Sequence, residues 1–250
     1  MEFVVLLYYA FVPISDPTQF MDSQLELCTN LGLKGRILVG DEGVNGTVSG
    51  PSEATQAYKE VMWADERFLT MEFKESCSDV VPFPKLKVKA RAEIISLHDA
   101  SLDLEDKGEY ISPDNLHALY QTGEEFYILD ARNNYESIEG SFKGAVTPDI
   151  NHFRDLPGVI NAYDELKGKK IVTYCTGGIR CEKASALLRQ RGFKDVYQLE
   201  GGIVSYIMKY PNTNFEGDCY VFDDRMRLTQ EEIATHGAVS RAPQCQVPQL

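Results

Sequence analysis

Apolar positions in the first 75 residues alternate between strand spacing and helix spacing. Runs typical of strands occur at Phe3–Tyr9, Arg36–Val39, Thr47-Val48 and Phe68–Phe73. One helix is predicted from the N-cap and proline pair Asp16-Pro17 to Gly32, and a second over Ser52–Trp63. The resulting βαββαβ order predicts an α+β domain of the ferredoxin-like or acylphosphatase-like type over residues 1–80.

A tight turn is predicted inside this domain at Asn45-Gly46, a dipeptide that favours two-residue hairpin loops. Asp41 and Glu42 flank the same glycine-rich stretch, and we interpret them as turn-forming acids.

A basic strip follows Pro82-Phe83-Pro84. Its alternation has period two, so in a strand its four cations share one face: Lys85, Lys87, Lys89 and Arg91. Two interpretations remain open, an edge strand protected from aggregation by lysines or a contact for an RNA phosphate backbone. We expect this strand to belong to a linker over residues 81–111.

Strands and helices alternate again over residues 112–211. Buried strands are predicted at Phe126–Leu129, Lys169–Tyr174 and Val196–Leu199, and helices at Ser112–Tyr120, Asp155–Leu166 and Glu182–Gln190. This alternation predicts an α/β domain with a parallel sheet covered by helices on both faces. Residues 212–250 are weakly patterned and form a predicted C-terminal extension.

Composition limits the class of protein. The 250 residues carry a formal net charge of −13, which argues against a surface coated in basic residues but not against a local basic patch. The apolar run Phe3–Ile14 is too short to span a bilayer, so we expect a cytoplasmic protein with no membrane contact. The six cysteines form no CxxC pair and the four histidines are scattered, so we expect neither a disulfide framework nor a metal site.

The segment from Cys175 to Cys181 carries the clearest chemistry. A strand runs into Cys175, Gly177 and Gly178 allow a sharp turn, and a helix follows. Backbone N–H groups and the positive end of the helix dipole would then favour the thiolate of Cys175. The side chains of Thr176 and Arg180 would complete an anion cradle around a nucleophilic sulfur.

The spacing of this loop separates two chemistries. Cysteine-based phosphatases place their arginine in a C-x5-R loop, whereas Cys175 and Arg180 form the shorter C-x4-R, which suits sulfur transfer or a small covalent adduct. Cys181 stands where a phosphatase would have arginine. It is either a resolving thiol for an oxidised or persulfidated Cys175 or a small packing residue at the start of the helix.

Residues 112–211 resemble the rhodanese domain. The active-site loop of that family matches Cys175-Thr176-Gly177-Gly178-Ile179-Arg180, and its upstream strand-end motif matches Leu129-Asp130-Ala131-Arg132. The resemblance implies that Asp130 and Arg132 support the loop. Residues 137–143 depart from the family's usual motif.

Four ordered motifs extend the resemblance over nearly the whole chain: Asp41–Gly50, Pro82–Val88, Cys175–Lys183 and Gly217–Arg225. Together they resemble the tRNA uridine hydroxylase (TrhO) family. This resemblance implies 5-hydroxylation of the wobble uridine of tRNA, with molecular oxygen as co-substrate, no evident cofactor and Cys175 as the essential cysteine. Many members continue into a cysteine-rich tail; here only Cys219 and Cys245 remain, so we expect a shortened chain.

Two other functions fit the residues. A sulfurtransferase working through a Cys175 persulfide would use the same loop. A non-catalytic RNA-binding or protein-interaction module with a vestigial rhodanese fold is the second alternative, and the retained Cys175 and Arg180 argue against it. The sequence carries no signal for an oligomeric state.

Overall fold

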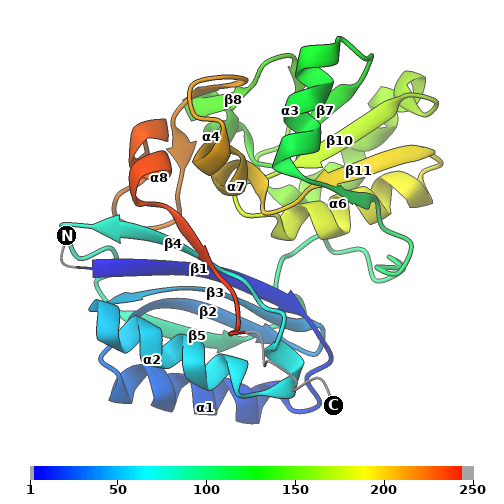
Figure 1. The fold of residues 1–250 in the computed structure, drawn as a ribbon. Helices are drawn as coiled ribbons and strands as arrows, with labels where there is room; N and C mark the ends of the chain where they lie inside the picture. Colours follow the sequence, from blue (N-terminus) through cyan, green and yellow to red (C-terminus); the bar gives the residue numbers. More distant parts are fainter. Residues whose placement is uncertain (1–2, 244–250) are drawn as a thin grey trace, which may run out of the picture. The chain divides into compact units, whose positions relative to one another are not determined.

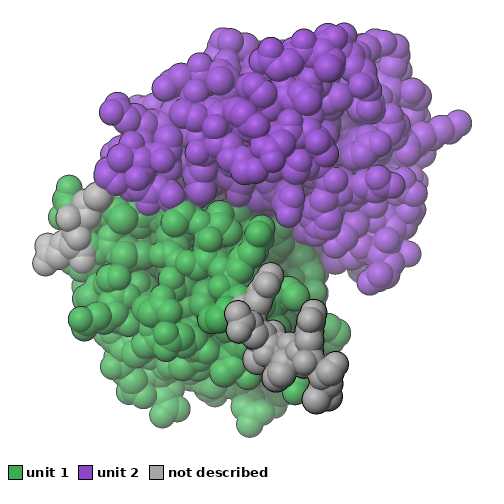
Figure 2. Space-filling view, viewed as in Figure 1, with its two compact units in different colours: residues 1–94, 238–250 green, residues 95–237 purple. Residues whose placement is uncertain are grey.

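The computed structural model describes residues 3–243, which divide into two compact units (Figure 2). Unit 1 contains residues 1–94 and 238–250, and unit 2 contains residues 95–237. The compact units divide the chain at residues 94/95 and 237/238, whereas the sequence analysis placed divisions at residues 80, 111 and 211. The reason is strand pairing, because the basic strand and a strand near the C-terminus both join the sheet of unit 1.

Unit 1 confirms the predicted βαββαβ order. Its six-stranded sheet has the order β15-β4-β1-β3-β2-β5, and α1 and α2 cover one face (Figure 1). The four central strands are antiparallel, β15 pairs antiparallel with β4, and β5 pairs parallel with β2. The elements are β1 (Phe3–Phe11), α1 (Pro17–Asn30), β2 (Lys34–Gly40), β3 (Gly43–Gly50), α2 (Ser52–Trp63), the 3-10 helix η1 (Glu66–Phe68), β4 (Phe73–Ser78), β5 (Leu86–Ala90) and β15 (Ala238–Ser240).

Local signals fix the first helix. The Asp16 carboxylate accepts a hydrogen bond from the N–H of Gln19, and Pro17 occupies the first turn, where its missing N–H costs nothing. Gly32, just after the helix, adopts a φ of +68°. The predicted strand over 68–73 is wrong, because residues 66–68 form η1 and the strand begins at Phe73.

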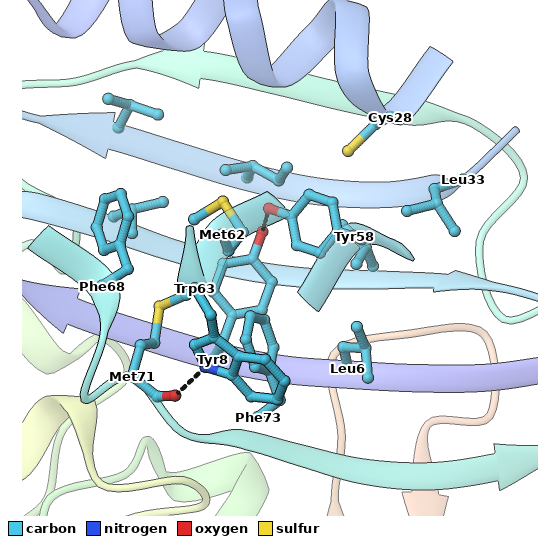
Figure 3. Packing of buried hydrophobic residues seen from close by; sticks show 14 of the residues in the cluster. Leu6, Tyr8, Cys28, Leu33, Tyr58, Met62, Trp63, Phe68, Met71 and Phe73 are labelled. Carbon is cyan, nitrogen blue, oxygen red and sulfur yellow. Dashed lines mark hydrogen bonds between the residues drawn. The ribbon is translucent and has the colours of Figure 1, made fainter. Parts of the chain in front are cut away.

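The core between the sheet and the helices of unit 1 is aromatic (Figure 3). The hydroxyls of Tyr8 and Tyr58 lie 2.5 Å apart, and Tyr58 donates to the buried Gln24 at 2.7 Å. The indole N–H of Trp63 donates to the carbonyl of Met71 at 2.9 Å. These contacts satisfy the polar atoms that the large rings carry into the core.

The predicted turn at Asn45-Gly46 is wrong. Gly40 pairs with Gly43, so Asp41 and Glu42 form the two-residue hairpin turn, and Asn45 and Gly46 lie within β3. A Cβ at Gly46 would lie 2.3 Å from the ring of Tyr8. Glycine is needed here for close packing against an aromatic ring.

Unit 2 has the predicted parallel sheet, with the order β6-β11-β10-β7-β9. The predicted helix over 155–166 is replaced by a short α-helix and 3-10 turns. The elements are β6 (Glu109–Ile111), α3 (Pro113–Thr122), β7 (Tyr127–Asp130), α4 (Asn134–Glu139), β8 (Gly140–Phe142), β9 (Ala145–Val146), η2 (Phe153–Asp155), α5 (Leu156–Val159), η3 (Ile160–Leu166), β10 (Lys170–Tyr174), α6 (Ile179–Gln190), β11 (Asp195–Leu199), α7 (Gly202–Lys209), β12 (Phe215–Gly217), β13 (Cys219–Tyr220), β14 (Arg227–Leu228) and α8 (Gln230–His236).

Alternate side chains of this sheet enter two separate cores. Val172 and Tyr174 of β10 pack in a cluster with residues of α3, α7 and α8, whereas Ile171 packs in a cluster with residues of α5 and α6. Both faces of the sheet are therefore buried, as the continuous apolar strands predicted. Within residues 3–243, no helix is long and apolar enough to cross a membrane.

Candidate active site

The loop that holds Cys175 connects β10 to α6 in unit 2. Tyr174 is the last residue of the strand, and α6 begins at Ile179. Gly178 adopts a φ of +106°, a conformation that favours glycine, and its N–H donates to the sulfur of Cys175 at 3.1 Å. The sulfur therefore lies at the N-terminal end of a 12-residue helix, where backbone N–H groups and the helix dipole favour an anion.

The charge state of Cys175 follows from competing effects. Burial raises the pKa of Cys175, but a hydrogen bond with Cys181, the positive charge of Arg180, and the N–H groups of Arg180 and Gly178 lower it, so that the pKa lies at about 5. Burial and the neighbouring Cys175 raise the pKa of Cys181. At neutral pH, Cys175 is a thiolate and Cys181 remains a thiol that donates to it.

Arg180 is held by a partner that the sequence analysis missed. Its guanidinium donates to both carboxylate oxygens of Glu136, at 2.5 and 2.7 Å, and both side chains are buried. Arg180 therefore directs its fork at a carboxylate of the protein itself. Its charge and N–H still act on the thiolate, while one guanidinium nitrogen lies 3.4 Å from the hydroxyl of Thr176.

Glu136 had one local signal in the sequence. It is the third residue of α4, and its carboxylate also accepts from the N–H of Asn133 at 3.1 Å, which is a capping arrangement. That signal predicts a helix start and gives no indication of the contact with Arg180.

Asp130 and Arg132 form a second buried ion pair, with a shortest distance of 2.6 Å. The hydroxyl of Tyr174 donates to Asp130 at 2.7 Å, and Arg132 donates to the carbonyl of Gly140 at 2.6 Å. The structure thus places both residues against Tyr174, the neighbour of Cys175. Fixing Tyr174 also fixes the end of β10 from which the loop departs.

The start of α7 supports the loop from a third direction. The N–H groups of Ile203 and Val204 donate to the carbonyls of Cys175 and Thr176, at 2.9 and 3.2 Å. Gly202 has a φ of +67°, and a Cβ there would lie 2.4 Å from the carbonyl oxygen of Cys175. The sequence analysis gave no indication of this contact between Gly202 and the loop.

Aromatic side chains lie beside the arginine of the loop. The ring of Phe222 lies 5.7 Å from the Arg180 guanidinium, and Tyr220 contacts both Phe222 and Tyr135 edge to face. Phe222 is 45% exposed and Tyr135 is 43% exposed, although both are large and aromatic. This cluster comes from the Gly217–Arg225 motif and α4, and nothing local in the sequence connects the two.

The remaining candidates are distributed as follows. Gly177 is buried within the loop and Ile179 begins α6. Cys175 lies in unit 2, whereas the four cations of the basic strip lie in unit 1: Lys85, Lys87, Lys89 and Arg91. Within the described residues, no group of three His, Cys, Asp or Glu side chains could hold a metal ion. Cys219 is a buried free thiol, and Cys245 lies outside the described residues.

Comparison with known families agrees with the two units. Residues 3–94 match the UPF0176 acylphosphatase-like domain, and residues 112–209 match the rhodanese-like domain. The tRNA uridine(34) hydroxylase of Aster yellows witches'-broom phytoplasma is 47% identical over 91% of this chain and 75% of its own length. That of Oceanobacillus iheyensis is 48% identical over 91% of this chain and 72% of its own length. That of Cytophaga hutchinsonii is 44% identical over 90% of this chain and 72% of its own length.

Proposed function

Because the chain belongs to the tRNA uridine(34) hydroxylase family, we propose that it is an enzyme that hydroxylates C5 of the wobble uridine of tRNA, with molecular oxygen as co-substrate. The observation that carries the proposal beyond the family name is the Cys175 thiolate at the N-terminal end of α6. A thiolate is the form of cysteine that can attack an electron-poor ring.

The proposed chemistry uses this thiolate as a temporary nucleophile. Addition of the Cys175 sulfur to C6 of uracil forms an S–C6 bond and moves an electron pair toward C5, which then bonds to oxygen. Loss of the C5 proton and cleavage of the S–C6 bond restore the aromatic ring and the thiolate. Overall, one atom of O2 converts C5–H to C5–OH, and the other becomes water with two electrons and two protons from a donor such as a pair of thiols, which are oxidised to a disulfide.

The residues around Cys175 have defined tasks in this scheme. The N–H groups of Gly178 and Arg180 hold the sulfur as an anion between turnovers. Glu136 pairs with Arg180, so the buried guanidinium of the loop has a buried counter-charge. Cys175 is fully buried, so addition requires the uracil ring to reach the sulfur inside the loop region.

A sulfurtransferase is the second candidate, favoured by the same C-x4-R loop and by the rhodanese-like domain match. In that reaction the Cys175 sulfur would accept a sulfur atom from a donor such as thiosulfate and pass it to a nucleophile. It needs neither O2 nor a uracil ring.

Nucleoside mass spectrometry separates the two functions. Unmodified tRNA would be incubated with the protein either under 18O2 or without oxygen. The proteins compared are wild type, Cys175→Ser and the control Cys77→Ser, which replaces a cysteine of unit 1. We expect 5-hydroxyuridine carrying one 18O atom from wild type and Cys77→Ser only. A product made equally by Cys175→Ser would refute the role of the thiolate. Thiosulfate-to-cyanide transfer without any 5-hydroxyuridine would establish the sulfurtransferase.

A substituted substrate tests the covalent step itself. A tRNA with 5-fluorouridine at position 34 cannot lose a C5 proton after the addition of sulfur. We therefore expect a protein–RNA adduct on Cys175, detectable as a mass increase after nuclease digestion. Hydroxylation of normal tRNA without any such adduct would contradict addition to C6.

A further inference from the structure

The basic strip predicted from the sequence is one half of a larger surface in unit 1. β5 lies beside β2 (Figure 1). The two strands pair in parallel register, with Arg36 opposite Lys87 and Leu38 opposite Lys89. Ile37 and Val39 of β2 point into the core, so the intervening residues of β2 point to the opposite face of the sheet. We call the exposed cations on this face the two-strand patch: Lys34, Arg36, Lys85, Lys87, Lys89 and Arg91.

The patch is electrostatically uniform. Neither β2, β3 nor the segment 85–91 contains an acidic residue. Strands in a sheet lie about 4.8 Å apart and alternate residues about 6.7 Å apart, so the cations form a dense two-row array. The strands that carry this array supply no counter-charge, which favours the approach of an external polyanion.

The pairing of the other cations in unit 1 makes the patch exceptional. Unit 1 has ten lysines and arginines. Outside the patch, Lys59 pairs with Glu75, Arg67 with Asp65 and Arg241 with Glu72. Lys74 lies over the ring of Tyr9. No residue of the patch forms an ion pair with any of the described residues.

Protection of an edge strand explains only part of this arrangement. β5 is the edge of the sheet, and lysines on an edge discourage pairing with another chain. β2 is an interior strand, paired on both sides, so Lys34 and Arg36 have no such task. The presence of two exposed cations on β2 therefore favours a binding surface over protection of an edge strand.

We propose that the two-strand patch binds the phosphate backbone of tRNA and is the part of the protein that holds the RNA. This proposal rests on the proposed function for the identity of the polyanion. A protein with a net charge of −13 repels tRNA overall, so binding requires a local surface whose cations are not already neutralised.

The salt dependence of tRNA binding gives the measurable consequence. Each phosphate contact contributes about 0.7 to 0.9 to the slope of log affinity against log salt. Six contacts would give a slope of about −4 to −5. Removing the registered pair with Arg36→Gln and Lys87→Gln should lower the magnitude of the slope by about 1.4 to 1.8.

The experiment compares three full-length proteins by measuring tRNA affinity at 50 and 200 mM salt. They are wild type, the double variant Arg36→Gln with Lys87→Gln, and a control double variant, Arg154→Gln with Lys194→Gln, which removes the same charge from exposed sites in unit 2. Between these salt concentrations, wild type and the control should lose about tenfold more affinity than the patch variant. Thermal unfolding of the patch variant should match that of wild type, because both side chains are exposed.

The outcomes distinguish the patch from the proposed function. Equal salt slopes and equal tRNA affinities for the patch and control variants would refute tRNA binding by the two-strand patch, even if wild type makes 5-hydroxyuridine. Strong, salt-dependent tRNA binding that the patch variant weakens, with no hydroxylated product, would support the patch and refute the hydroxylase. If the patch variant binds tRNA normally but loses binding to polyglutamate, the surface serves an acidic protein and the RNA assignment is wrong.

Discussion

Replacing Glu136 by glutamine tests the central geometric claim about the site. Glutamine keeps the shape of the side chain and one acceptor oxygen but removes the charge opposite Arg180. In the structure the two groups are joined by hydrogen bonds of 2.5 and 2.7 Å, and their side chains are only 0% and 5% exposed. The guanidinium would then be a buried charge with no formal counter-charge beyond the Cys175 thiolate.

The expected loss of stability is large for a single substitution. Removing one partner of a buried ion pair costs about 3 to 5 kcal/mol, and the retained acceptor of glutamine favours the lower end of this range. A loss of about 3 kcal/mol lowers Tm by about 6 to 12 °C for a protein of 150 to 250 residues. This is a substantial part of an unfolding free energy that is typically about 5 to 15 kcal/mol.

Calorimetry of Glu136→Gln would be compared with Asp114→Asn. Asp114 pairs with Lys209 at 2.7 Å, but both side chains are more than half exposed, so its loss should leave Tm nearly unchanged. The same Tm change for both variants would refute the buried pair as the main support of Arg180.

Thiol chemistry gives this variant a second readout. Loss of the Glu136 charge leaves the positive charge of Arg180 to act on Cys175 without opposition, so the pKa of Cys175 should fall further. The pH midpoint of Cys175 alkylation should therefore move to lower pH in the folded variant. A midpoint that moves to higher pH would show that Arg180 has turned away from the sulfur.

Three further predictions follow from single contacts. Because the folded pKa of Cys175 is about 5, its alkylation in wild type should rise through pH 5 and level off by pH 7, whereas the unfolded protein should titrate near pH 8.5; Cys175→Ser provides the blank. Gly202→Ala should abolish 5-hydroxyuridine formation, since its Cβ would overlap the Cys175 carbonyl at 2.4 Å, while Gly168→Ala, with open space around it, should retain product. Tyr8→Phe should lower the free energy of unfolding in urea by about 1 to 3 kcal/mol, because the buried Tyr58 hydroxyl loses a partner, and an unchanged midpoint would contradict this contact.

The sequence alone determined the features that depend on short stretches of chain. The strand, glycine turn and helix around Cys175 follow from adjacent residues, because backbone conformation and helix capping are local properties. The βαββαβ order and the parallel sheet also follow from periodicity, since burial on one or both faces imposes a period that can be read along the chain. The cation face of the strip over 85–91 is an instance of the same rule.

Tertiary structure decided every property that joins distant segments. Glu136 lies 44 positions from Arg180, yet its carboxylate accepts two hydrogen bonds from that guanidinium, a contact that local reasoning did not indicate. Asn45-Gly46 is a dipeptide typical of turns, yet both residues lie within β3. Gly46 packs against the ring of Tyr8, which would lie 2.3 Å from a Cβ at that position. The pairing of β5 with β2 moved the basic strip into unit 1 and gave it two further cations. The physical reason is common to all three cases, because burial and ion pairing are decided by which surfaces meet in space, and the local sequence pattern does not encode that choice.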